Sequence, residues 1–124
     1  DWYRWTNWFG YRKYGFKWKW LDLNKTYCFD IDNTICITEG TDYENSKPIK
    51  ERIKIINALK DEGNTIIFFT ARGFVSKIDF LELTKSQLNK WGLKYDKLYM
   101  GKPDADYYID DKNYDLFGWF EWIV

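Results

Sequence analysis

The chain has 124 residues, which suits one domain with a single sizeable core and is too short for two ordinary domains. Its 19 basic and 19 acidic side chains cancel, so overall charge does not indicate nucleic acid or an anionic membrane as an obligatory partner. Because there is no histidine, a Ser-His-Asp triad, a Cys-His pair and a histidine-ligated zinc site are excluded. The remaining chemistry belongs to carboxylates, lysine and hydroxyl groups.

Aromatic residues make up 22% of the chain and are concentrated at its two ends. Residues 1–20 contain ten of them, interleaved with arginine and lysine, and form a distinct N-terminal extension. We interpret them as packing on the domain's own core or on a partner subunit. Membrane-interface anchoring and base stacking stay open as alternatives. The aromatic tail at 117–122 mirrors this beginning, and packing between the two ends is a further option.

The domain itself spans 21–124, with a core from about 21 to 115 whose first half is predicted as strand, loop and helix. An apolar run predicts a strand over 26–31, and 38–46 is expected to be a polar loop. Ser46 is predicted to cap a helix over 48–62, which Gly63 ends.

The second half of the core is predicted to hold three strands and one helix. The strands are expected over 65–70, 95–100 and 107–109. Ser76 and Asp79 resemble a capping box that opens the helix, and Gly92 ends it. Alternation of strands and helices predicts a parallel sheet with right-handed crossovers.

Two acids, Asp30 and Asp32, stand where the first predicted strand ends. Alternation along a strand would send both to the same side, where like charges repel unless a cation or a shared proton lies between them. Carboxylate oxygens suit Mg²⁺. The sequence therefore predicts a site for a hard divalent cation.

Polar groups follow all four predicted strands and are expected at one edge of the sheet: Asp30 and Asp32, Thr70, Lys102, Asp110 and Asp111. A carboxylate can attack phosphorus and form an acyl phosphate, while a second acid protonates the leaving oxygen and later deprotonates water. Mg²⁺ offsets repulsion between an anionic nucleophile and an anionic substrate, and lysine and hydroxyl groups stabilise the transferring oxygens. These are the parts of a phosphoryl-transfer site.

The ordered motifs DIDNT, FFTARG and GKPDADYYIDDK resemble those of the haloacid dehalogenase (HAD) superfamily of phosphatases, over roughly residues 26–111. The resemblance implies an α/β fold, a Rossmann-like three-layer sandwich with a parallel sheet of order 3-2-1-4. About 35 residues separate Thr34 from Thr70 and a similar number separates Thr70 from Lys102, so neither gap holds a cap domain. A capless member with an open site suits a large or polymer-linked substrate, or an oligomer whose neighbour serves as lid. The motif wording is most similar to small phosphatase-like proteins of bacterial capsule or surface-polysaccharide synthesis.

The resemblance also implies roles for individual residues. Asp30 would be the nucleophile that becomes aspartyl phosphate, and Asp32 the general acid and base. Thr70 would bind phosphoryl oxygens, and Lys102 would offset charge on the nucleophile and phosphate. Asp110, with Asp111, would complete an Mg²⁺ shell that includes Asp30 and the backbone carbonyl of Asp32. Asn33 stands where glycine is common, and we expect it to tolerate the turn.

Four further residues are candidates for substrate recognition. Arg72 follows the phosphate-binding threonine and could reach a substrate anion, although a surface arginine fits the pattern equally. Glu39, Asp42 and Tyr43 lie in the loop after the first motif, where the family's substrate-facing flap would fall.

The leading functional prediction is a Mg²⁺-dependent phosphatase acting on a sugar, polyol or other small metabolite phosphate. A nucleic-acid end phosphatase is a less favoured alternative, motivated by the basic aromatic extension. A third alternative is a structural subunit of a larger assembly or homo-oligomer with the aromatic ends as its interface and little or no catalysis. Cys28 and Cys36 favour reduced thiols over a disulfide framework, which indicates the cytoplasm. No signal peptide or transmembrane run is evident, although the chain begins with Asp1 rather than methionine.

Overall fold

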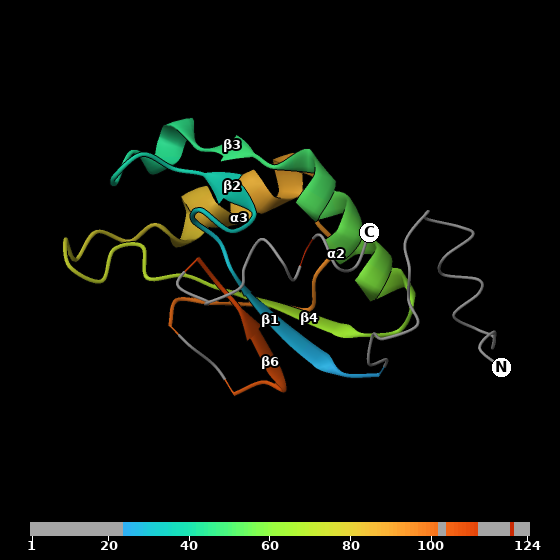
Figure 1. Ribbon diagram of the computed structural model, residues 1–124. Helices are drawn as coiled ribbons and strands as arrows, with labels where there is room; N and C mark the ends of the chain where they lie inside the picture. The colour runs from blue at the N-terminus through green and yellow to red at the C-terminus, as the bar shows by residue number, and fades with distance from the viewer. Residues whose placement is uncertain (1–23, 102–103, 112–119, 121–124) are drawn as a thin grey trace, which may run out of the picture.

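The fold is an α/β arrangement around a four-stranded parallel sheet, as expected from the alternation of strands and helices (Figure 1). The computed structural model describes residues 24–101, 104–111 and 120. The strands are β1 (Thr26–Asp30), β4 (Thr65–Phe69), β5 (Lys97–Tyr99) and β6 (Tyr107–Ile109), and the order across the sheet is β5-β4-β1-β6. Numbered along the chain, this order is 3-2-1-4. The acidic strand β1 is therefore internal, between β4 and β6.

The register of the sheet brings the ends of three strands level with one another. Asp30, the last residue of β1, pairs with Phe69, the last residue of β4, and Phe29 pairs with Ile109, the last residue of β6. Because all three strands are parallel, the residues that follow them emerge at the same edge. This edge is where open α/β sheets bind ligands.

Both described helices, α2 (Lys50–Asp61) and α3 (Leu81–Lys90), lie on the same side of the sheet (Figure 1). They bury one continuous apolar cluster, whose fully buried members include Phe29 and Phe68 from the sheet, Ile56 and Leu59 from α2, and Leu88 from α3. Each such side chain contributes about 1.5–3 kcal/mol through burial, so this face supplies most of the stability.

The opposite face of the sheet carries a smaller cluster. Cys28, Ile67 and Phe69 are buried there, with Ala105 and Tyr108 packed against them. Among residues 24–101 and 104–111 there is no helix on this face, so the third layer of the expected sandwich stays a prediction.

A small antiparallel ribbon follows β1, where the sequence predicted a loop and a helix start. It consists of β2 (Cys36–Ile37) and β3 (Lys47–Pro48), with the 3-10 turn η1 (Tyr43–Asn45) between them. Since Pro48 pairs with Cys36 in this ribbon, it does not begin the helix, and α2 starts at Lys50 instead. The predicted cap is also wrong, because the Ser46 hydroxyl bonds to Thr38 rather than to the helix.

The second helix begins at Leu81, five positions after Ser76, the first residue of the predicted capping box. The Ser76 hydroxyl accepts a hydrogen bond from the N–H of Ile78, and Asp79 accepts one from the N–H of Leu81. These local bonds hold 76–80 as a loop, so α3 starts at Leu81. The predicted stops are confirmed: Gly63 and Gly92 follow the two helices with φ of 100° and 77°.

The segments between the sheet strands leave no room for an inserted domain. The ribbon and α2 fill 31–64, and a loop and α3 fill 70–96.

No helix among the described residues has the length and apolar character needed to cross a membrane. The expectations for residues 1–20 and for most of the aromatic tail lie outside the described residues. Phe120 is the exception, since it is buried in the main cluster with its ring 6.4 Å from that of Phe29.

Candidate active site at the carboxyl edge of the sheet

Asp30 and Thr70 line the same open cavity, of about 490 Å³, at the carboxyl edge of the sheet. Asp30 ends β1 and Thr70 follows β4, the neighbouring strand. The Thr70 N–H donates to the carbonyl of Tyr99, and its hydroxyl oxygen accepts from the N–H of Arg72. Among the described residues the Thr70 hydroxyl has no acceptor for its own proton, so it can donate that proton to a ligand in the cavity. These two predicted site residues, forty positions apart in the sequence, are brought together by strand pairing.

The Asp30 carboxyl is electrostatically strained. Its pKa is raised from 3.8 to about 7, chiefly by burial and also by the nearby carboxylates of Asp111, Asp32 and Asp110. The N–H of Ile31, which donates to Oδ1 at 2.8 Å, acts in the opposite direction and lowers the pKa. A carboxyl group near half-ionisation at neutral pH, facing a cavity, is typical of functional sites.

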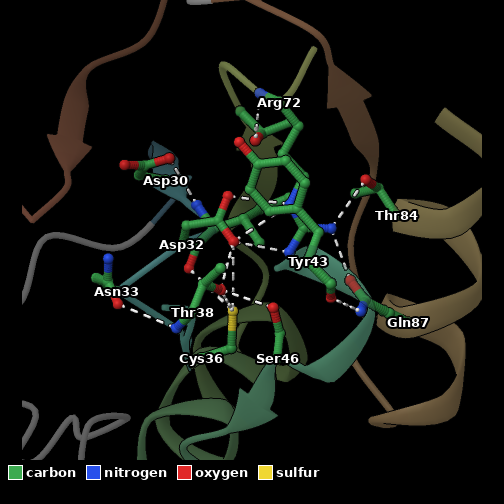
Figure 2. Close-up of polar contacts among 12 residues, drawn as sticks. Asp30, Asp32, Asn33, Cys36, Thr38, Tyr43, Ser46, Arg72, Thr84 and Gln87 are labelled. Atoms are coloured by element: carbon green, nitrogen blue, oxygen red, sulfur yellow. Dashed lines mark hydrogen bonds and ion pairs between the residues drawn. The ribbon is translucent and has the colours of Figure 1, made fainter. Parts of the chain in front are cut away.

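Asp32 does not share the surroundings of Asp30. Its carboxylate faces Arg72, whose Nη2 lies 2.7 Å from Oδ1 and whose Nε lies 3.0 Å from Oδ2 (Figure 2). The two acids were expected to project to the same side, close enough to repel each other. The repulsion is confirmed, since the Asp32 carboxylate raises the pKa of Asp30, but the two carboxyl groups point in different directions (Figure 2). The reason is that β1 ends at Asp30, after which the chain bends at Ile31, so the alternation of the strand does not continue to Asp32.

The guanidinium of Arg72 is buried within the protein. Its Nη1 donates to the Thr84 hydroxyl at 3.1 Å and to the Gln87 side-chain oxygen at 2.6 Å, both on α3. The whole side chain has no exposed surface. Arg72 lines the same cavity as Asp30 and Thr70, as expected of a substrate-binding candidate. In this conformation, however, its guanidinium binds Asp32 and α3 instead of facing the cavity.

The ribbon after β1 completes the surroundings of Asp32. The Thr38 hydroxyl donates to Asp32 Oδ1 at 2.7 Å, and since its single proton is used there, the Ser46 hydroxyl must donate to Thr38, at 2.6 Å. Asn33, at φ 63°, accepts the N–H of Thr38 through its side chain, so the expectation that asparagine tolerates this turn is confirmed. Figure 2 shows this network around Asp32, with Asp30 pointing away from it.

Tyr43 covers the Arg72–Asp32 pair rather than lining the cavity. Its ring lies 4.7 Å from the Arg72 guanidinium carbon and meets the Phe80 ring edge-on at 4.9 Å. Its carbonyl accepts a hydrogen bond from the Gln87 amide. The other two flap candidates, Glu39 and Asp42, line a separate hollow of about 250 Å³.

Sequence reasoning missed three polar residues that support the pair, namely Thr38, Thr84 and Gln87. The available signal was on α3, where Thr84 and Gln87 are three residues apart and Leu88 follows, so they share its buried face. Two polar side chains on a buried helical face predict a buried partner. Lys102 lies outside the described residues.

Of the predicted metal ligands, Asp30 lines the cavity, and its carboxylate oxygens are of the type that Mg²⁺ prefers. Among the described residues no group of three or more His, Cys, Asp or Glu is gathered closely enough to hold a metal ion. Mg²⁺, however, commonly keeps several waters and uses one or two carboxylates. The mutual repulsion of Asp30 with Asp110 and Asp111 is what a bound cation would relieve, so the residues present fit the ion. Cys28 and Cys36 are both buried, and they form no disulfide, as expected.

Comparison with known proteins supports the fold. No family model and no curated protein matches the chain. The chain is similar to the crystal structure of a structural-genomics target from Vibrio cholerae, with a TM-score of 0.62 and 25% sequence identity over 77% of this chain and 87% of the other. Fold and site together define an α/β protein with a cavity at the carboxyl edge of a parallel sheet, where the carboxyl group of Asp30 ends the central strand.

Proposed function

We propose that this protein is a phosphomonoester hydrolase of the HAD type, acting through an aspartyl-phosphate formed on Asp30. One observation carries the proposal: Asp30 and Thr70 line one cavity at the carboxyl edge, on adjacent parallel strands. The motif order along the sequence and the strand order 3-2-1-4 are both consistent with it.

In the proposed reaction a carboxylate oxygen of Asp30 attacks phosphorus, and the bond to the leaving-group oxygen breaks. The Thr70 hydroxyl donates a hydrogen bond to a phosphoryl oxygen, where negative charge is concentrated. Water then attacks the phosphorus of the aspartyl-phosphate, releasing inorganic phosphate and regenerating Asp30.

Asp32 is the proposed proton carrier for the leaving oxygen and for the attacking water. In the present conformation its carboxylate is paired with Arg72, so proton transfer requires its side chain to turn toward Asp30. Arg72 then acts as the group that sets the resting position of Asp32.

Mg²⁺ would be held by Asp30 with Asp110 or Asp111 and, as the family resemblance implies, the backbone carbonyl of Asp32. When bound, it supplies positive charge that favours the ionised form of Asp30 and offsets the charge of the phosphoryl group.

The test is a turnover screen over small-molecule phosphomonoesters and 3′- or 5′-phosphorylated oligonucleotides, with and without Mg²⁺, using Asp30→Asn as the blank. We expect Mg²⁺-dependent phosphate release that is lost in Asp30→Asn while circular dichroism stays unchanged. Turnover that survives this substitution would disprove the nucleophile assignment.

A further inference from the structure

One wall of the cavity beside Asp30 is apolar and open to solvent. Phe74 and Ile78, on the loop between β4 and α3, are 74% and 58% exposed, and Met100, just after β5, is 41% exposed. Phe69 and Phe80 line the same cavity. Exposed apolar side chains gathered at a cavity, rather than scattered singly, indicate a binding surface. This set, Phe69, Phe74, Ile78, Phe80 and Met100, is called the apolar wall below.

The loop that carries the apolar wall, drawn in yellow-green in Figure 1, is held by specific backbone contacts. The N–H of Lys77 donates to the carbonyl of Gly73 at 2.9 Å, and the N–H of Phe74 donates to the carbonyl of Ala71 at 3.0 Å. Gly73 has φ of 84°, and a Cβ placed there would stand 2.1 Å from the carbonyl oxygen of Ile78. The fold of this loop therefore requires glycine at this position and presents Phe74 and Ile78 without large rearrangement.

Charge does not dominate recognition at the apolar wall. Two acids, Asp30 and Asp79, and two bases, Arg72 and Lys77, line the cavity, so the charges of its lining balance. The guanidinium of Arg72 is moreover already paired with Asp32. The Lys77 ammonium also lies 5.3 Å from the centre of the Phe74 ring, so its charge is engaged in a cation–π contact within the loop. What distinguishes this wall is its aromatic and thioether surface.

The size of the cavity indicates that more than a phosphoryl group binds there. A volume of about 490 Å³ is within the range of small-molecule sites. A sugar or polyol placed against the apolar wall would lose water from hydroxyl groups that gain few polar partners, which is unfavourable. An aromatic ring instead stacks on or meets the edge of phenylalanine and interacts favourably with a methionine sulfur.

We propose that the apolar wall binds the leaving group of the substrate and that this leaving group carries an aromatic ring, so that the substrate class is an aryl or nucleobase-containing phosphomonoester. The inference rests on the proposed function, because it assumes that the phosphoryl group lies at Asp30. It narrows the expectation of a general small-metabolite phosphate to one chemical class.

The test compares phenyl phosphate and a nucleoside monophosphate with methyl phosphate as substrates of the full chain. Phe74→Ala and Met100→Ala remove parts of the apolar wall, and Val75→Ala is the matched control, since Val75 is 90% exposed on the same loop and does not line the cavity. We expect Phe74→Ala to raise KM for the ring-bearing substrates roughly 5- to 10-fold with little change in kcat, because the Phe74 ring stabilises the bound substrate and the transition state equally. Phe74→Ala should affect methyl phosphate less than the ring-bearing substrates, and Val75→Ala should leave the turnover of all three substrates unchanged. Which ring-bearing substrate has the higher kcat/KM distinguishes an aryl from a nucleobase leaving group.

Binding measurements separate this inference from the proposed function. Calorimetry with phenylphosphonate and methylphosphonate should show about tenfold tighter binding of the former, which Phe74→Ala abolishes and Val75→Ala retains. Tighter binding of phenylphosphonate without turnover of any substrate would disprove the proposed hydrolase activity but support the proposed aromatic binding site. Turnover with no ring preference, or equal effects of Phe74→Ala and Val75→Ala, would overturn the aromatic site alone.

Discussion

The fully buried Arg72 guanidinium forms a two-point ion pair with the Asp32 carboxylate, with Nη2 2.7 Å from Oδ1 and Nε 3.0 Å from Oδ2. Forty residues separate the two, and the pair joins the turn after β1 to the turn after β4. Planar donors facing a carboxylate give both strength and a fixed orientation. Asp32 is 20% exposed at its side chain, so the pair lies between a core ion pair and a surface one.

Removal of the Arg72 guanidinium should strongly destabilise the fold. In Arg72→Gln the Asp32 carboxylate, Thr84 and Gln87 lose their donor, and we expect a loss of about 2–4 kcal/mol, slightly below the usual value for a buried pair since Asp32 retains some solvent. Urea unfolding monitored by circular dichroism measures it. The exposed control Lys85→Ala, which breaks the 4.0 Å pair with Glu82, should change stability by less than about 0.5 kcal/mol.

A double-mutant cycle tests whether the two residues act as a unit. Asp32→Asn combined with Arg72→Gln should cost less than the sum of the single losses, since the second substitution removes a charge that the first left unpaired. Additive losses would contradict a direct coupling of the pair.

The ionisation of Asp30 should make stability fall as pH rises. Its pKa is about 7 in the folded protein, mainly because of burial, against 3.8 ordinarily, so the folded state binds the proton more tightly. The stability that this tighter proton binding gives the folded state is therefore fully present below about pH 4 and is lost as pH rises through about 7. Asp30→Asn should be more stable than the wild type at pH 8 by on the order of 2 kcal/mol, and by less at pH 5.

Urea unfolding with a chelator present, at pH 5 and pH 8, measures this difference. Asp104→Asn, at an exposed acid outside the cavity, serves as control and should show no such trend. Mg²⁺ added at pH 8 should stabilise the wild type more than Asp30→Asn. Equal stabilisation of both would argue that the ion binds elsewhere.

A methyl group at Gly73 should disrupt the loop beside the cavity. Gly73→Ala combines a positive φ of 84° with a close approach of 2.1 Å to the Ile78 carbonyl oxygen, so the backbone must move. We expect a loss of about 2–3 kcal/mol, from strain that a left-handed conformation alone does not account for. Gly40→Ala, at φ 58° with nothing within 4 Å, is the matched control and should lose about 1 kcal/mol. Thermal unfolding distinguishes the two, and equal shifts would rule out the close approach.

Both thiols should be unreactive in the folded protein. Cys28 and Cys36 have no exposed surface, and burial raises the pKa of the Cys36 thiol, which lowers its thiolate fraction at neutral pH. A chromogenic disulfide reagent should react with two thiols at once in urea and much more slowly without it. Rapid reaction of one thiol in the native protein would show that its segment opens readily.

Local sequence patterns were enough for the sheet and for the ends of the helices. The apolar runs in β1 and β4 are nearly continuous, as in strands buried on both faces, and their bounds agree with the prediction within one residue. Gly63 and Gly92 marked the helix ends because a left-handed residue costs other side chains energy.

Helix beginnings were less predictable, since they depend on what competes for the same residues. Ser46 and Pro48 are good helix-start residues, yet the ribbon pairs Pro48 with Cys36, and Ser46 donates to Thr38. A capping signal is a local preference of about 1 kcal/mol, which tertiary pairing readily outweighs. The same applies to Ser76, whose hydroxyl serves a turn.

The sequence by itself determined that acids and a threonine would meet at one edge of a parallel sheet, because strand direction and the ends of apolar runs are properties of the chain. Only the tertiary structure decided which partners each of those groups contacts. The bend after Asp30 separates its carboxyl from that of Asp32, and the second acid is held by Arg72, whose other partners come from α3. Contacts between residues forty positions apart depend on how helices and turns dock, and that information lies in the packing of the whole domain rather than in any single motif.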